Sequence, residues 1–254
     1  MTSFIDSFGS EWLKKRRTAA SLLTVTGSFL IPLIVIIARI DDARSLTAAN
    51  QQPRIWESLY NRNWQLMGML FLPMGVVLAT SLVTQLEYRN NTWKQLCTTP
   101  QTLTTIFLAK LAVIFVMLLE FVILFTLGIW LTGALPGLFF RGVSYPAEAF
   151  PWMSVLDGSA RFILDILPVV TLQYLLSLRF KNFLIPLGVG LGLYVASMIA
   201  VRWRYGYFIP YTYSAYNFIG QAAEKFHTHY WAAGYTLLFT GLAYILYITR
   251  KEKG

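Results

Sequence analysis

Two acidic residues stand inside long apolar stretches of the sequence, where an ionised side chain is costly. Glu120 is the only charged residue between Leu111 and Phe140, and Asp165 lies within the otherwise apolar residues 162–178. A charge at the centre of a membrane costs roughly 2.5–3.5 kcal/mol on insertion scales. Asp165 follows Arg161 by four residues, which predicts an ion pair between them near one membrane face.

Glu120 has no oppositely charged neighbour along its own helix. We therefore expect its side chain to face the protein interior, a dimer interface or a water-filled path. Two roles stay open for it: a protonated, hydrogen-bonded group that packs the protein, which we favour, or a contact to a transported substrate.

The remaining reactive side chains do not form the patterns that catalysis requires. His227 and His229 stand two residues apart with no carboxylate or cysteine that completes a metal site beside them, so we interpret them as interface histidines. The sequence has no G-x-S-x-G, no H-E-x-x-H and no G-x-x-x-x-G-K-[ST] phosphate-binding loop. We expect no catalytic residue, metal or cofactor on this chain, and any ATPase must be a separate chain.

The elements that carry these residues must be membrane helices. The 254 residues are 56% hydrophobic and 13% charged, whereas a soluble domain is about 25% charged. A helix that crosses the bilayer needs about 20 apolar residues, so the chain holds roughly six spans, with no room for a soluble domain of about 100 residues. The 18 Phe, 14 Tyr and 8 Trp exclude disorder, and the single Cys97 excludes an internal disulfide.

We predict an all-α membrane protein in which residues 1–254 form one transmembrane domain. The apolar run from 111 to 140 is too long for one straight span, so its helix should end near Gly133 or Pro136. The six spans are predicted at about 19–39, 63–86, 107–133, 158–178, 183–201 and 230–249.

The basic residues predict the orientation of the chain. With both termini in the cytoplasm, 12 of the 21 Lys and Arg residues fall on the inner side, as the positive-inside rule requires. These bases cluster beside apolar segments, which fits contact with lipid headgroups rather than with nucleic acid.

The first residues predict a short amphipathic helix on the inner membrane surface. Phe4, Phe8 and Trp12 recur at helical spacing on one face, followed by the bases Lys14, Lys15, Arg16 and Arg17. A simple anchor that only sets the topology is the alternative.

The polar connection after the second span holds a second short helix. Residues 88–97 contain the apolar anchors Tyr88, Trp93 and Leu96, and Pro100 would end the helix. Such a helix, fixed between two spans, could pass the motion of a partner to those spans. An ordinary loop packed on the membrane is the alternative.

Two segments make the sequence familiar: SEWLKKRRTA before the first span, and EYRNNTWKQLCTTPQTL after the second, with Lys110 in the next helix. Together with the six-span layout, they resemble the permease subunits of type-2 ABC exporters, especially the small permeases of bacteriocin-immunity and drug-efflux systems. The family often has Gly-Thr where this chain has Asn91–Thr92.

That resemblance implies a subunit that pairs with a second permease, identical or related, and docks two ATPase chains. Residues 88–97 would then be the coupling helix and the N-terminal helix a connecting helix. The residues implied in ATPase coupling are Glu87, Tyr88, Thr92, Trp93, Leu96 and Pro100.

Residues 203–231 are rich in aromatic side chains and broken by Gly206, Pro210 and Gly220. Tyr and Trp favour the membrane–water interface, so we predict one or two partial helices that dip into the outer leaflet. In this respect the segment resembles the short re-entrant helices that type-2 permeases have on the outer side between spans five and six. An aromatic-lined exit is one interpretation and a plain aromatic belt the other. The candidate residues of a pathway or a dimer interface are Glu120, Tyr207, Tyr211 and Tyr213.

These features together predict the permease of an ATP-driven exporter in a bacterial cytoplasmic membrane. ATP and magnesium would bind the partner ATPase, and the substrate would be a hydrophobic or amphipathic drug, lipid or antimicrobial peptide. The alternatives are a carrier or channel that works without ATP and a membrane-embedded enzyme that modifies lipid.

Overall fold

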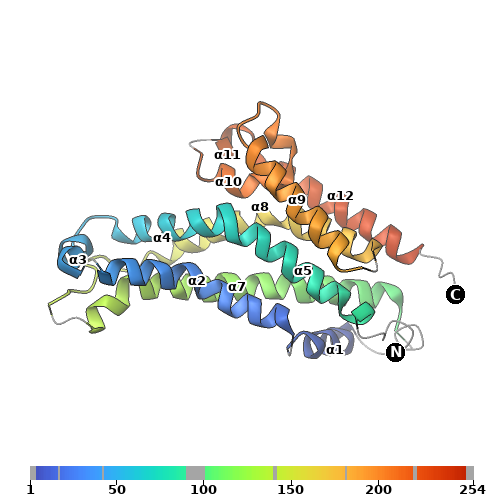
Figure 1. Cartoon of the computed structure of the whole chain (residues 1–254), viewed down its shortest axis with the longest axis horizontal. Helices are drawn as coiled ribbons and strands as arrows, with labels where there is room; N and C mark the ends of the chain where they lie inside the picture. Colours follow the sequence, from blue (N-terminus) through green and yellow to red (C-terminus); the bar gives the residue numbers. More distant parts are fainter. Residues whose placement is uncertain are drawn as a thin grey trace.

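The computed structural model is a bundle of long helices with a cluster of short helices beside it (Figure 1). It describes residues 4–16, 18–41, 43–89, 101–139, 142–180, 182–219 and 222–249, with the side chains of 43–45, 87–89 and 223–224 left out. Every regular element in these ranges is helical, which confirms the predicted all-α class.

The long helices account for most of the described chain. They are α2 (Ala19–Asp41), α4 (Ile55–Leu66), the π-helix η1 (Met67–Phe71), α5 (Leu72–Arg89), α7 (Leu103–Phe139), α8 (Trp152–Arg179), α9 (Leu184–Ala200) and α12 (Thr228–Ile248). The short elements are α1 (Phe4–Arg16), α3 (Ala43–Asn50), η2 (Gly206–Phe208), η3 (Pro210–Thr212), α10 (Tyr213–Tyr216) and α11 (Ala222–Lys225).

Five runs are long and apolar enough to cross a membrane: α2, the run Ile55–Leu86 through α4, η1 and α5, then α7, α8 and α12. The apolar helix α9 has 17 residues and falls below that length. The chain is therefore a multi-pass membrane protein, and the sixth span at α9 stays a prediction.

Helix α7 passes the point where we expected it to end. It runs through Gly133 and Pro136 to Phe139, and its 37 residues reach about 55 Å at 1.5 Å per residue. Gly133 serves packing instead of termination, because a Cβ there would lie 2.5 Å from the Trp56 ring. Pro136 lacks the N–H that would bond to the Thr132 carbonyl, and the helix continues for only three residues after it.

The polar residues 39–63, which lie between the predicted first and second spans, form the end of α2, all of α3 and most of α4. The amide of Asn50 donates to the Ser144 carbonyl at 2.6 Å, and the Trp56 indole N–H donates to the Glu148 carbonyl at 2.8 Å. These bonds tie the end of α3 and the start of α4 to the connection that leads into α8.

Aromatic packing forms the centre of the bundle. The buried Trp64 ring stacks on Phe162 of α8 at 4.2 Å between centroids and meets Phe125 of α7 edge-on at 4.9 Å. Alongside, α2 packs on α7 and α12 packs on α8. Helix α1, the end of α5 and the end of α12 lie at one end of the molecule, and α3 lies at the other (Figure 1).

The aromatic segment 206–219 contains the short elements η2, η3 and α10. The side chains of Tyr211, Tyr213 and Tyr216 are buried, and the segment packs against α8, α9 and α12. Its depth in a membrane stays a prediction.

Candidate functional site

A polar stripe on α1 packs against α7. Ser7, Glu11 and Lys15 recur every four residues along α1, and their exposed fractions are only 1%, 6% and 2%. The aromatic face that we singled out is less covered, since Phe4 is exposed and Phe8 and Trp12 are half-buried. Ser7 and Glu11 were not predicted as contact residues, although they share the four-residue spacing of the aromatics.

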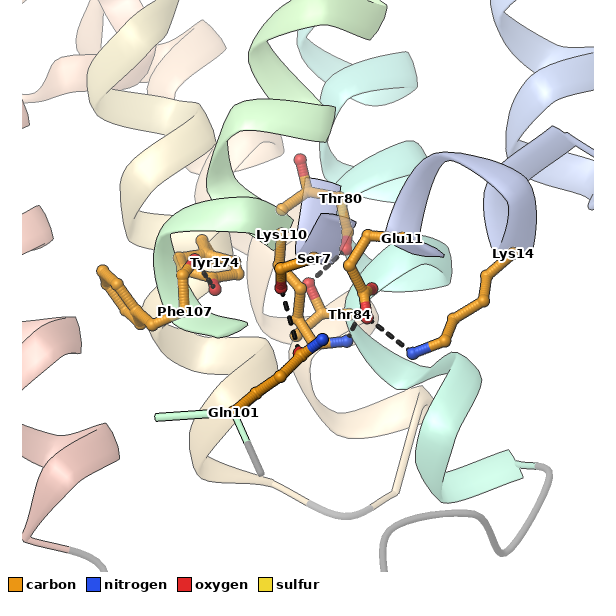
Figure 2. A network of polar contacts seen from close by, with 9 residues as sticks. All are labelled: Ser7, Glu11, Lys14, Thr80, Thr84, Gln101, Phe107, Lys110 and Tyr174. Carbon is orange, nitrogen blue, oxygen red and sulfur yellow. Dashed lines mark hydrogen bonds and ion pairs between the residues drawn. The ribbon is translucent and has the colours of Figure 1, made fainter. Parts of the chain in front are cut away.

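Glu11 lies at the centre of a polar cluster that also contains Ser7, Lys14, Gln101 and Lys110 (Figure 2). Its carboxylate accepts hydrogen bonds from Lys110 Nζ of α7 at 2.9 Å and from Lys14 Nζ at 2.5 Å. Burial by itself raises the pKa of the Glu11 carboxyl group, but the charges of Lys110 and Lys14 outweigh burial, so its pKa lies below the ordinary value. Glu11 is thus held as a carboxylate inside the protein.

A second ion pair joins α1 to α7 with the charges reversed. Lys15 Nζ donates to Glu120 Oε2 at 2.7 Å and lies 4.1 Å from the centroid of the Trp12 ring. Lys15 is 2% exposed and Glu120 31% exposed. Glu120 has no charged partner along its own helix, and its partner Lys15 lies 105 positions away in the sequence.

The four bases of the predicted surface helix have different surroundings. Lys15 is buried, Lys14 bonds Glu11, Arg16 is exposed, and Arg17 lies outside the described residues. The contact of α1 with the membrane surface stays a prediction, but at least one of its bases serves an internal ion pair.

The cluster extends from α1 toward α5 and α8 (Figure 2). The Ser7 hydroxyl donates to the Gln101 side chain at 3.1 Å, and the Tyr174 hydroxyl of α8 donates to the Phe107 carbonyl at 3.0 Å. On α5, the Thr84 hydroxyl donates to the Thr80 carbonyl at 2.7 Å. The cluster therefore lies where the chain leaves α5 and enters α7.

That connection contains the predicted coupling residues. Thr92, Trp93, Leu96 and Pro100 lie outside the described residues, and Glu87 and Tyr88 are described only as part of the α5 backbone. Their role in ATPase coupling stays a prediction.

Buried amides link α5 to α8 and α9. The Gln85 amide donates to the Phe180 carbonyl at 2.6 Å, and the Gln173 amide donates to the Ser81 hydroxyl at 2.7 Å and the Pro186 carbonyl at 2.8 Å. Buried amide bonds of this kind fix the relative register of helices, because breaking one leaves a polar group unpaired in an apolar interior.

Asp165 has partners that its sequence neighbours did not indicate. Arg161 instead pairs with Asp157 at 2.9 Å, and both are largely exposed. The Asp165 side chain is fully buried; it accepts a bond from Asn217 at 2.6 Å and contacts His229 Nδ1 at 2.8 Å. The predicted Arg161–Asp165 pair is therefore wrong, since residues 52 and 64 positions away in sequence occupy the carboxylate.

The candidate pathway residues belong to two separate places. Glu120 is bound to Lys15, whereas Tyr211 and Tyr213 are buried against α8. Tyr207 stacks on Phe226 at 5.1 Å. The structure does not bring Glu120 and the three tyrosines into one site.

An apolar cavity of about 420 Å³ lies among α2, η1, α5, α7, α8 and α9. Leu30, Met67, Phe71 and Phe121 are among its lining residues, and Thr24 and Thr80 supply the only polar side chains of the lining. Among the described residues, no group of three or more His, Cys, Asp or Glu side chains is placed to hold a metal ion.

Long apolar helices packed through buried ion pairs and amides define a multi-pass helical membrane protein. Residues 8–197 match the family model described as ABC-2 family transporter protein. The chain belongs to this family, which confirms the resemblance seen in the sequence, and it is a membrane permease component of an ABC transporter. No curated protein and no solved structure matches the chain.

Proposed function

We propose that this permease exports an apolar or amphipathic molecule from a bacterial cell across the cytoplasmic membrane. It works with six spans and both termini in the cytoplasm. A second permease copy, identical or related, completes the pathway, and two ATPase chains supply ATP and magnesium, because permeases of this family work with an ATPase partner.

The apolar cavity is the observation that carries the proposal. Its volume of about 420 Å³ falls in the range of sites that enclose drug-sized ligands, roughly 300–1,000 Å³. The two threonines in its lining offer few polar contacts, so burial of apolar surface would supply most of the binding free energy. A drug, a lipid or an apolar face of an antimicrobial peptide suits such a lining.

The polar cluster supports coupling to an ATPase at the end that holds the two termini. Helix α1 is fixed to α7 by two ion pairs. Buried amides fix α5 to α8 and α8 to α9. Motion imposed on residues 87–100 would therefore reach the helices that line the cavity as rigid elements.

The two alternatives predict different features. A carrier without ATP would place ionisable side chains along its pathway. Here Lys110 and Glu120 are engaged in ion pairs, Asp165 contacts His229, and none of the three lines the cavity. One observation favours the alternative of a lipid-modifying enzyme: His229 and Asp165 form a pair that could act as acid and base. Among the described side chains, however, His229 has no hydrogen-bonded hydroxyl or thiol that could act as a nucleophile.

Filling the cavity tests the proposal. A Cβ on Gly75 meets no neighbour within 4 Å, and Gly75 lines the cavity. Gly75→Leu should lower ATP-driven export of an apolar dye from proteoliposomes severalfold, while the ATPase subunit still co-purifies. The matched control is Gly188→Leu on α9, an exposed position outside the lining with equal space for a Cβ.

Equal export by both variants and the unaltered chain would remove the cavity from the pathway. Export by vesicles that contain no ATPase would contradict the ATP-driven mechanism itself.

A further inference from the structure

Asp165 is the point where three parts of the chain far apart in sequence are joined. Its Oδ2 accepts from Asn217 Nδ2 at 2.6 Å, and its Oδ1 lies 2.8 Å from His229 Nδ1. Asn217 directly follows α10 in the aromatic segment 206–219, and His229 stands in the first turn of α12. One buried carboxylate on α8 therefore holds both the segment and the last helix.

The charged and titratable groups around Asp165 leave one group to balance its charge. On α8, the Arg161 guanidinium is bound to Asp157. On α10, the Tyr213 phenol is close enough to Asp165 to interact with its charge. Tyr235 of α12 and Tyr216 are in turn close to Tyr213. These phenols are neutral near pH 7. Of the described side chains facing Asp165, only His229 can carry a positive charge that balances the carboxylate.

The geometry fixes where the proton binds. Because Nδ1 of His229 faces Asp165 Oδ1, an ionised Asp165 accepts a hydrogen bond from that nitrogen, and Nε2 is left as the position for one further proton. The side chain of His229 is 32% exposed, whereas that of Asp165 is fully covered. Protonation at Nε2 turns the contact into an ion pair, and loss of the proton leaves a buried carboxylate with neutral donors alone.

We propose that Asp165 and His229 bind one proton, and that this proton locks the segment 206–219 onto α8 and α12. The Tyr235 hydroxyl of α12 donates to the Phe208 carbonyl at 3.0 Å, a second tie that carries no charge. Without the proton, the uncompensated carboxylate favours hydration, and the segment separates from α8 around Asn217. This lock lies within one chain and does not depend on transport.

Amide hydrogen exchange of the whole chain in lipid nanodiscs tests the lock. After correction for intrinsic exchange, amides of residues 206–219 should open more often as the pH rises from about 5 to about 8. The slope should approach about tenfold per pH unit where opening releases one proton. Amides in the middle of α7 should show no such slope.

Variants assign the slope to the pair. Asp165→Asn combined with His229→Gln replaces charge by neutral hydrogen bonds and should give slow exchange without a slope. His229→Gln alone should give fast exchange at both pH values. Two matched controls, His227→Gln and Arg161→Gln, should keep the slope of the unaltered chain.

Three results would overturn the proposal. The first is corrected exchange in the unaltered chain that does not change with pH, a result that needs no variant to fold. The second is a slope that persists in the double variant. The third is loss of the slope in Arg161→Gln, which would return the charge balance of Asp165 to its own helix.

Discussion

The ammonium of Lys110 lies 2.9 Å from the carboxylate of Glu11, and this contact joins α1 to α7 across 99 positions of the sequence. Both side chains are almost fully buried, at 2% and 6% exposure. A charge pair this deep specifies where α1 docks, because any other position would bury each charge without its partner.

Removal of one member of this pair should destabilise the protein. Lys110→Met leaves the buried Glu11 carboxylate with only Lys14, and we expect a loss of about 3 kcal/mol in the free energy of unfolding. Denaturant titration in detergent micelles measures the loss. Lys14→Met, at a side chain that is 37% exposed, should cost at most about 1 kcal/mol. Full additivity in Lys110→Met with Glu11→Gln would contradict the pairing.

The lowered pKa of Glu11 predicts acid sensitivity. Because this pKa lies below its ordinary value of 4.5, the pair stabilises the fold fully above the pKa of the unfolded state. That contribution is lost as the pH falls through the folded-state pKa. Thermal unfolding between about pH 6 and about pH 3 should show the midpoint temperature falling less steeply for Glu11→Gln than for the unaltered chain. Parallel curves would exclude Glu11 as the cause.

Variants of the Lys15–Glu120 pair distinguish the two roles that the sequence left open for Glu120. If Glu120 serves packing, Glu120→Gln should cost about 1–3 kcal/mol, because it leaves the buried Lys15 cation without its carboxylate. Export by Glu120→Gln combined with Lys15→Met should then remain near that of the unaltered chain. Loss of export in a folded double variant would instead assign Glu120 to the substrate pathway.

Close contact between α4 and α7 depends on Gly133. A Cβ there would lie 2.5 Å from Trp56 ring carbons, so Gly133→Ala should destabilise the protein by about 1–3 kcal/mol through overpacking. Gly241→Ala is the control, since a Cβ there meets nothing within 4 Å. It should be neutral or slightly stabilising, because alanine favours the helix. Equal effects of the two substitutions would show that Trp56 moves aside freely.

The sequence predicts the helices well because their cause is local. Uncharged runs such as 63–86 must form helices in lipid, where each backbone polar group needs an internal partner. The spacing of Phe4, Phe8 and Trp12 likewise predicts a helix at the start of the chain. Its docking could not be predicted, because the stripe of Ser7, Glu11 and Lys15 contacts partners about 100 residues away, and polar stripes ordinarily face solvent.

The same distinction explains the error at Asp165. Arg161 is the correct distance along one helix for an ion pair, and local spacing favours it. The fold supplies His229 from α12 instead, and this partner is visible only once α8 and α12 are packed together. At α7 the error is of another kind, because Gly133 reads as a helix end in sequence yet serves packing against Trp56.

The π-helical turn η1 changes which faces the two halves of the second span, α4 and α5, present to their neighbours. A π turn inserts one residue into a helix, so the faces of α4 and α5 are offset in phase by about 100°. The Tyr194 hydroxyl donates to the Met69 carbonyl at 2.7 Å within this turn. In α4, before the turn, Trp56 and Trp64 face α7 and α8. In α5, after the turn, Ser81 and Gln85 face α8. A one-residue deletion between Met67 and Phe71 would rotate one half of the span against the other and move one of these two sets of side chains away from its partners.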